Sequence, residues 1–212
     1  MIKREENSNL IKPRRIGIMG GTFDPVHLGH MDVAEAAIEE VGLEEVWMMP
    51  AYIQPFKQDR IIADARDRIK MLELAVEQSR HIKISSWEID KEIVSYTFDT
   101  IKGLLEENCI DDIFFLLGSD ALMKVESWYK GKEILNMCGF IVGLRSTENR
   151  TSLEVYAKHL KDSYGTEIIL LEREMRPISS TTIRSLVSEG KSLSGLVSRA
   201  VEEYIYANEL YT

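Results

Sequence analysis

Cysteine is scarce in this chain: its 212 residues include only two, Cys109 and Cys138. The two thiols lie in unrelated contexts and match no spacing that metal ligands use. We interpret both as free cysteines of a protein that works in the reducing cytoplasm.

Long apolar runs are absent as well. No stretch approaches the roughly 18 residues that span a bilayer. The N-terminal sequence has basic residues but no apolar segment behind them, so it is not a signal peptide. We therefore expect no membrane partner and a cytoplasmic location.

The chain also lacks an excess of positive charge. The chain has 26 Lys and Arg residues against 35 Asp and Glu residues, a formal net charge of −9. This balance argues against a nucleic-acid partner, because proteins that bind duplex DNA normally carry an excess of Lys and Arg. An anionic substrate would have to be held by a local cluster of cations and helix N-termini.

What is present is an ordinary globular composition, with 44% hydrophobic and 29% charged residues. Apolar runs typical of strands alternate with segments whose apolar residues recur every three or four positions, as in helices. This alternation predicts an α/β, doubly wound fold with a mainly parallel sheet and a helical C-terminal end. Residues 1–14 are expected to be a flexible leader and residues 15–212 a single domain.

The expected elements follow from these patterns. A capping-box pattern from Thr151 to Glu154 marks the start of one helix. We expect strands at 15–19, 46–49, 81–85, 113–117, 140–144 and 167–171, and helices at 28–41, 65–76, 95–107, 151–160, 180–189 and 193–208.

The first motif is Gly20-Gly-Thr-Phe-Asp-Pro-Val-His-Leu-Gly-His30, which leaves the first strand and enters the first helix. Ligands of open α/β sheets bind outside the carboxyl ends of strands, so the turn is well placed. Its glycines allow close backbone approach, its amides can face a phosphate, and the helix dipole adds positive potential. His27 and His30 are expected to project from one face. A zinc site would explain only the histidines, whereas a phosphate site explains the whole motif.

The second motif, Pro177-Ile-Ser-Ser-Thr-Thr-Ile-Arg184, follows the last strand and opens a helix. A capped helix start would explain its Ser and Thr residues without any function. It would not explain Arg184, because a cation in the first turn of a helix is unfavourable unless it faces an anion.

Both motifs resemble the signatures of the H-x-G-H nucleotidyltransferase superfamily, and the first looks like the form found in bacterial nicotinate mononucleotide adenylyltransferases. The resemblance covers roughly residues 15–212 and implies a Rossmann-like nucleotidyltransferase fold. It implies catalytic roles for His27, His30 and Arg184. The implied ATP-binding residues are Gly20, Gly21, Thr22, Phe23, His27, His30, Gly118, Asp120, Ile178, Ser179, Ser180, Thr181 and Arg184.

Other segments resemble the family's site for nicotinate mononucleotide. Without the resemblance, we would read Ser95-Tyr-Thr-Phe-Asp-Thr100 as a helix cap and Ser127-Trp-Tyr129 as core packing. With it, Thr97 would receive the pyridine carboxylate and Trp128 would stack on the ring. One departure is Phe56, which replaces a histidine usual in the family. The implied nicotinate mononucleotide-binding residues are Thr22, Lys57, Thr97, Trp128, Tyr129 and Arg145.

The resemblance implies adenylyl transfer from ATP to nicotinate mononucleotide, giving deamido-NAD and pyrophosphate, a step of NAD biosynthesis. Mg²⁺ would be bound mainly through the ATP phosphates and water, because the sequence shows no carboxylate cage and we expect no metal ligand from the protein. The sequence leaves the oligomeric state open, a homo-oligomer included.

Two other functions compete with this one. Phosphopantetheine adenylyltransferases share the H-x-G-H chemistry, but they are shorter and lack the Ser-Tyr-Thr and Ser-Trp-Tyr segments. A nucleotide-sensing module would keep the site without turnover. Both histidines and Arg184 are present, which favours catalysis.

Overall fold

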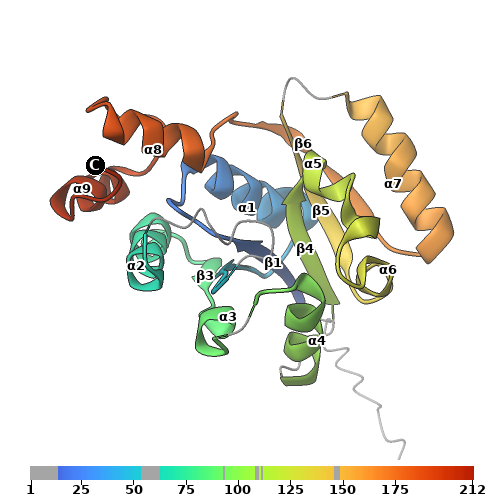
Figure 1. Ribbon diagram of the computed structural model, residues 1–212. Helices are drawn as coiled ribbons and strands as arrows, with labels where there is room; N and C mark the ends of the chain where they lie inside the picture. The colour runs from blue at the N-terminus through green and yellow to red at the C-terminus, as the bar shows by residue number, and fades with distance from the viewer. Residues whose placement is uncertain (1–13, 54–62, 93, 108–109, 111, 146–148) are drawn as a thin grey trace, which may run out of the picture.

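A six-stranded parallel sheet forms the centre of the computed structural model, which describes residues 14–53, 63–92, 94–107, 110, 112–145 and 149–212 (Figure 1). The strand order is β3-β2-β1-β4-β5-β6, and each neighbouring pair is parallel. The strands are β1 (Arg15–Gly21), β2 (Glu45–Pro50), β3 (Ile82–Ile84), β4 (Asp112–Gly118), β5 (Gly139–Arg145) and β6 (Ile168–Met175). The predicted doubly wound α/β architecture is confirmed.

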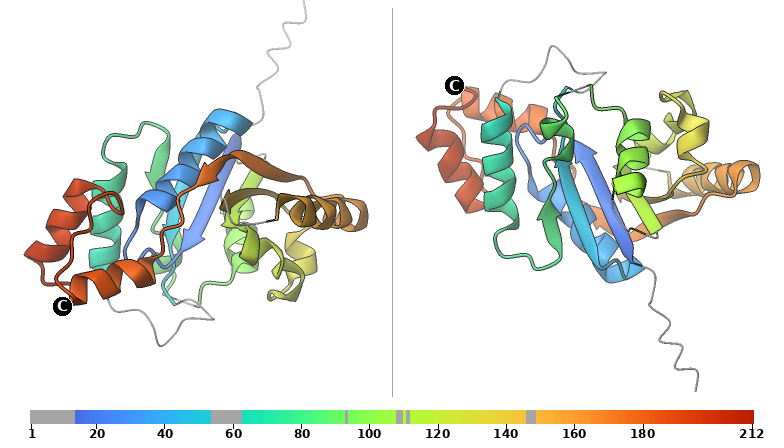
Figure 2. Two further views of the ribbon diagram at one scale, coloured as in Figure 1. Left: turned by 90° about the horizontal axis from the view of Figure 1, so that it is seen from above. Right: turned by 90° about the horizontal axis from the view of Figure 1, so that it is seen from below.

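Helices cover both faces of the sheet (Figure 2). They are α1 (Leu28–Val41), α2 (Ala65–Val76), α3 (Trp87–Asp90), α4 (Thr97–Glu107), α5 (Ser119–Leu122), α6 (Gly131–Ile134), α7 (Arg150–Tyr164), α8 (Ser180–Ser188) and α9 (Arg199–Ala207), with a 3₁₀ turn η1 (Val125–Ser127). One apolar core joins the sheet to α1, α2, α8 and α9, and the other joins it to α4, α5, α6 and α7.

The two cores explain why residues 113–117 of β4 are all apolar. Phe114 and Leu116 enter the first core, whereas the residues on either side of them enter the second. Successive side chains of a strand point to opposite faces, so a strand covered on both faces must be apolar at every position.

Several element boundaries differ from those predicted. The expected capping box is wrong: Asn149 caps α7, and its side chain accepts a hydrogen bond from the Ser152 amide at 3.2 Å. The last predicted helix begins at Arg199 rather than Leu193, because Gly195 has a φ of 79° and Ser198 provides the N-cap. The short helices α3, α5 and α6 were not predicted, since single turns carry too little periodicity.

The strand order reverses between β1 and β4. The chain proceeds outward from β1 to β3, returns to β4 beside β1, and then proceeds outward to β6. Open α/β sheets bind ligands at this switch point, outside the carboxyl ends of the strands. The first motif leaves β1 there, and Gly118 to Asp120 leave β4 there.

Some expectations lie outside the described residues. These are residues 1–13 of the expected leader, Cys109, Phe56 and Lys57. Within the described chain, no helix is both long enough and apolar enough to cross a membrane.

Phe114→Ala tests the assignment of the core. Phe114 is 0% exposed. Deleting its ring should lower the free energy of unfolding by about 3–5 kcal/mol, because the packed interior cannot fill the space. Urea denaturation followed by circular dichroism measures the change. Val155 is 68% exposed on α7 and supplies the control, Val155→Ala, with a change within about 0.5 kcal/mol. Equal effects of the two substitutions would contradict the core assignment.

Candidate active site

Two stacked histidine rings lie at the start of α1. The ring centroids of His27 and His30 are 3.6 Å apart, with an interplanar angle of 19°. His27 is the N-cap residue, and its backbone amide donates to Nδ1 of His30 at 3.2 Å. An accepting Nδ1 leaves Nε2 of His30 to carry the ring proton. Both rings therefore lie together, as the spacing predicts.

The turn before α1 supports these rings. The aromatic side chain of Phe23 is 2% exposed, and its edge contacts His30 at a centroid distance of 5.0 Å. To reach this position Phe23 adopts a φ of 51°, which is costly for a residue with a side chain. At Gly29, a Cβ atom would lie 3.1 Å from Nδ1 of His27 and 3.2 Å from the carbonyl oxygen of Arg176. A side chain at this position would therefore have to displace the His27 ring or the Arg176 backbone by a few tenths of an ångström.

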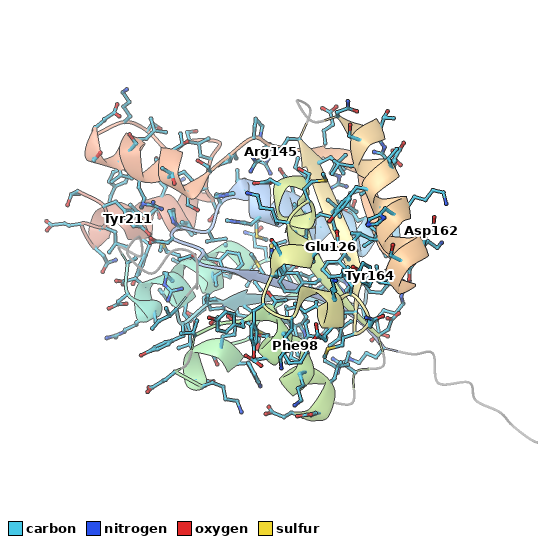
Figure 3. The ribbon with its side chains drawn as sticks, turned by 45° about the vertical axis from the view of Figure 1, so that its right-hand side comes forward. Phe98, Glu126, Arg145, Asp162, Tyr164 and Tyr211 are labelled. Atoms are coloured by element: carbon cyan, nitrogen blue, oxygen red, sulfur yellow. The ribbon has the colours of Figure 1, made fainter. Side chains whose placement is uncertain are left out.

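His27 is buried and neutral. Burial lowers the pKa of His27 to about 4, and Arg145 at the end of β5 acts in the same direction. Nδ1 of His27 is buried and has no hydrogen-bond partner among the described residues. A buried polar atom without a partner is uncommon in proteins and is compatible with a ligand that completes the site. Figure 3 shows Arg145 near the end of β5.

The second motif contacts the first. The hydroxyl of Ser180 donates to the Pro25 carbonyl at 2.9 Å. Nη1 of Arg184 donates to the Asp24 carbonyl at 2.7 Å and lies 3.9 Å from the Asp24 carboxylate. Arg184 is expected to face an anion, and the anion that it faces in the structure is the Asp24 carboxylate of the same chain. Two segments about 155 residues apart in sequence are therefore in direct contact.

A second ion pair fastens the segment before α8 to α1. Nε of Arg176 donates to the Asp32 carboxylate at 2.6 Å, and the pair is bidentate. Asp32 is 8% exposed, so the pair is shielded on the carboxylate side. Bidentate pairs of this kind fix orientation as well as distance.

The rest of the second motif lies as its sequence predicts. Ser179 caps α8, and its side chain accepts from the Thr182 amide at 3.1 Å. Ile178 is buried, whereas Thr181 is exposed.

The two segments expected to bind nicotinate mononucleotide, residues 95–100 and 127–129, also approach one another. The rings of Tyr96, next to Thr97, and Tyr129 have centroids 4.7 Å apart. Trp128 packs edge-on against Phe115 of β4 at 6.1 Å. A Cβ atom on Gly20 would lie 3.2 Å from the same Phe115 ring. Phe115 therefore lies between the first motif and Trp128.

Other expected residues occupy the same edge of the sheet. Gly118 precedes α5, and a Cβ atom there would lie 3.2 Å from Oδ1 of Asp120, which is exposed. Gly21 ends β1, where a Cβ atom would meet the Phe23 ring at 3.2 Å. The Thr22 carbonyl accepts a hydrogen bond from Arg68 at 2.8 Å.

Sequence reasoning missed several residues that hold the site together. They are Asp24, Asp32, Arg68, Phe115, Arg176 and Tyr211. Asp24 lies inside the first motif and could have been found there. The others are single residues in segments without a motif, and their partners are distant in sequence.

The described residues contain no cluster of three His, Cys, Asp or Glu side chains that could hold a metal ion.

Comparisons with known proteins agree with the geometry. A family described as cytidylyltransferase-like matches residues 18–186. A protein of Moorella thermoacetica, described as a probable nicotinate-nucleotide adenylyltransferase, is 38% identical over 205 residues, covering 96% of this chain and 94% of the relative. A protein of Clostridium beijerinckii with the same description is 36% identical over 203 residues, covering 93% and 99%. The chain belongs to the nicotinate-nucleotide adenylyltransferase family.

A solved structure shares the fold of this family member. The Plasmodium falciparum nicotinic acid mononucleotide adenylyltransferase complexed with NaAD superposes with a TM-score of 0.77 at 20% sequence identity, covering 93% of this chain and 97% of that one. The likeness confirms the predicted Rossmann-like nucleotidyltransferase fold.

The lowered pKa of His27 can be tested by titration. The ring of His27 should remain neutral down to about pH 4 in an NMR titration of the folded protein. In the unfolded chain the same ring binds a proton near its ordinary pKa of 6.5. Between these values the unfolded state holds more protons, so stability should fall as the pH drops from 6.5 to 4, by roughly 3 kcal/mol.

A matched variant isolates this effect. His27→Gln should remove that part of the pH dependence, whereas His159→Gln, on an exposed part of α7, should leave it unchanged. A His27 signal that titrates near pH 6.5 in the folded protein would contradict the buried neutral ring.

Proposed function

We propose that this chain transfers the adenylyl group of ATP to nicotinate mononucleotide, releasing pyrophosphate and deamido-NAD. The observation that carries the proposal is the meeting of the two motifs at the switch point of the sheet. Arg184 and Ser180 there contact the turn that leads to the histidine pair. Family membership supports the choice of both substrates.

The reaction is an in-line displacement at the α-phosphorus of ATP. A phosphate oxygen of nicotinate mononucleotide forms the new P–O bond, while the bond to the bridging oxygen of pyrophosphate breaks and that oxygen keeps the electron pair. The attacking oxygen is already anionic, so no general base is required. Catalysis then consists of positioning and of neutralising the growing charge.

The first-motif side chains suit this task. A neutral imidazole donates one hydrogen bond without placing a full charge in the site. We assign His27 and His30 to donate to phosphate oxygens that gain charge in the transition state, and Arg184 to bind the phosphates of ATP. Thr22 and Lys57 are assigned to align the attacking phosphate, and Arg145 to add positive potential there.

We expect Mg²⁺ to enter this site bound to the phosphates of ATP. It would supply further neutralisation of phosphate charge, held by the nucleotide and water, in keeping with its strongly held hydration shell. We place the reaction in the cytoplasm and assign no role to a second copy of the chain.

The aromatic segments suit the pyridine ring. Thr97 is the first residue of α4, where backbone N–H groups have no partner within the helix. Trp128 offers a face for offset stacking. We propose that the Thr97 hydroxyl and the backbone amides near Thr97 and Tyr129 receive the pyridine carboxylate.

The histidines provide the first kinetic test. His27→Ala or His30→Ala should lower kcat about 10²- to 10³-fold, because donors to developing charge act mainly in the transition state. A coupled pyrophosphate assay measures the rate, and a thermal melt checks folding. His159→Ala serves as the control and should retain full activity. A folded His27→Ala or His30→Ala variant with near-normal kcat would remove that residue from the mechanism.

Acceptor choice provides the second test. The acid mononucleotide should exceed its amide by roughly a hundredfold or more in kcat/KM, because the amide NH₂ would face donors and leave a buried group unpaired. Trp128→Ala should weaken both acceptors alike, since stacking does not sense the charge. Thr97→Val should reduce the acid-to-amide ratio.

Equal kcat/KM values for acid and amide in the wild-type protein would refute this assignment of the pocket. Turnover of phosphopantetheine in preference to both would instead identify the competing adenylyltransferase.

A further inference from the structure

The chain after α9 returns to the first motif. The hydroxyl of Tyr211 donates to Oδ1 of Asp24 at 2.7 Å, across 187 positions of sequence. Figure 3 shows Tyr211 on the side of the molecule where α8 and α9 lie. Glu209 and Tyr211 have φ values of 51° and 65°. Residues with side chains keep such a conformation only where the surrounding contacts hold them.

Asp24 is the shared partner of this contact and of the second motif. Its side chain is 2% exposed, and Oδ1 also accepts from the Ala63 amide at 3.2 Å. Oδ2 lies 3.9 Å from Nη1 of Arg184, farther than a hydrogen bond. Arg184 instead donates to the Asp24 main-chain carbonyl at 2.7 Å. The guanidinium is thus close to the carboxylate without being hydrogen-bonded to it through Nη1.

A second buried cation steadies the same turn. Arg68 is 1% exposed, and its Nη1 donates to the carbonyls of Thr22 and Ala51, both at 2.8 Å. Burial lowers the pKa of Arg68, and the Asp24 carboxylate opposes this effect in part. The carboxylate therefore lies among Arg68, Arg184 and Tyr211, and its position decides how strongly it attracts each cation.

The Tyr211 hydroxyl stays a donor. Burial, together with the Asp24 carboxylate, raises the pKa of Tyr211, so the phenol keeps its proton. A neutral donor satisfies the carboxylate without adding a positive charge that would repel Arg184.

We propose that Tyr211 is a positioning residue for ATP binding: its hydroxyl holds the Asp24 carboxylate so that Arg184 remains available to the phosphates of ATP. This inference rests on the proposed role of Arg184. Without the hydroxyl, the carboxylate loses one donor and draws the guanidinium from the present 3.9 Å into a shorter, hydrogen-bonded ion pair, which competes with ATP.

The chain offers a matched control. The hydroxyl of Tyr204 on α9 donates to Oδ1 of Asp67 at 2.8 Å. This bond has the same chemistry, but it joins α9 to α2 and does not touch the first motif. Tyr204→Phe and Tyr211→Phe therefore remove equivalent groups, and only the second should affect Arg184.

The experiment measures ATP binding by calorimetry in the absence of an acceptor, together with turnover. Tyr211→Phe should raise the Kd for ATP about tenfold or more, since hydrogen bonds to charged groups are stronger than neutral ones. Tyr204→Phe should change it less than about twofold. In an Arg184→Gln background, Tyr211→Phe should have no further effect, because its target has been removed.

Two outcomes would overturn the proposal. One is an equal change in ATP affinity for Tyr211→Phe and Tyr204→Phe, and the other is a full Tyr211→Phe effect in the Arg184→Gln background. Either outcome would mean that the Tyr211 hydroxyl only stabilises the fold. Thermal melts would then show a lower Tm for Tyr211→Phe.

A further pair of variants tests the same mechanism through the carboxylate itself. Asp24→Asn removes the negative charge, so Asp24→Asn with Tyr211→Phe should bind ATP as tightly as Asp24→Asn alone. A tenfold loss in the double variant would contradict the mechanism.

The same measurements separate the two proposals. A wild-type protein that binds ATP but does not modify nicotinate mononucleotide would refute the proposed acceptor, while the Kd values would still test Tyr211. A wild-type protein that does not bind ATP would overturn both proposals.

Discussion

The hydrogen bond from Arg184 to the Asp24 carbonyl is the contact on which the site depends. It joins a turn that leaves the first strand of the sheet to a helix near the end of the chain, and Ser180 repeats the connection at Pro25. Each segment supplies one part of the proposed phosphate site. The parallel sheet makes the contact possible, because the carboxyl ends of all its strands meet at one edge.

Local charge at this edge opposes the charge of the whole chain. The sequence has a net charge of −9, yet Arg145, Arg176 and Arg184 gather around the first motif. Asp32 forms an ion pair with Arg176, and Asp24 lies close to Arg184. These two carboxylates orient the guanidinium groups. The same arrangement keeps His27 neutral, since burial and nearby cations both oppose its protonation.

The sequence predicted the sheet, its helices and the two motifs because these depend on local patterns: apolar periodicity, glycine turns and caps. It did not predict the contacts of Arg68 or Tyr211, because a buried arginine and a tyrosine beyond the last helix have no local signature. The sequence pattern also predicts too early a start for α9. Residues 193–197 are apolar enough for a helix, but Gly195 takes a left-handed conformation that ends the pattern.

Phe115 shows how the sheet can set the distance between two substrates. Its ring lies against Gly20 on one side and Trp128 on another, so a shift in one segment is passed to the other. Close-packed interiors transmit such displacements instead of absorbing them. In-line transfer needs the reacting atoms within about 3–3.5 Å, a tolerance that mobile loops alone hold poorly. Under the proposed placement of ATP at the first motif and of the pyridine ring at Trp128, the buried strand β4 would fix the distance between the two substrates.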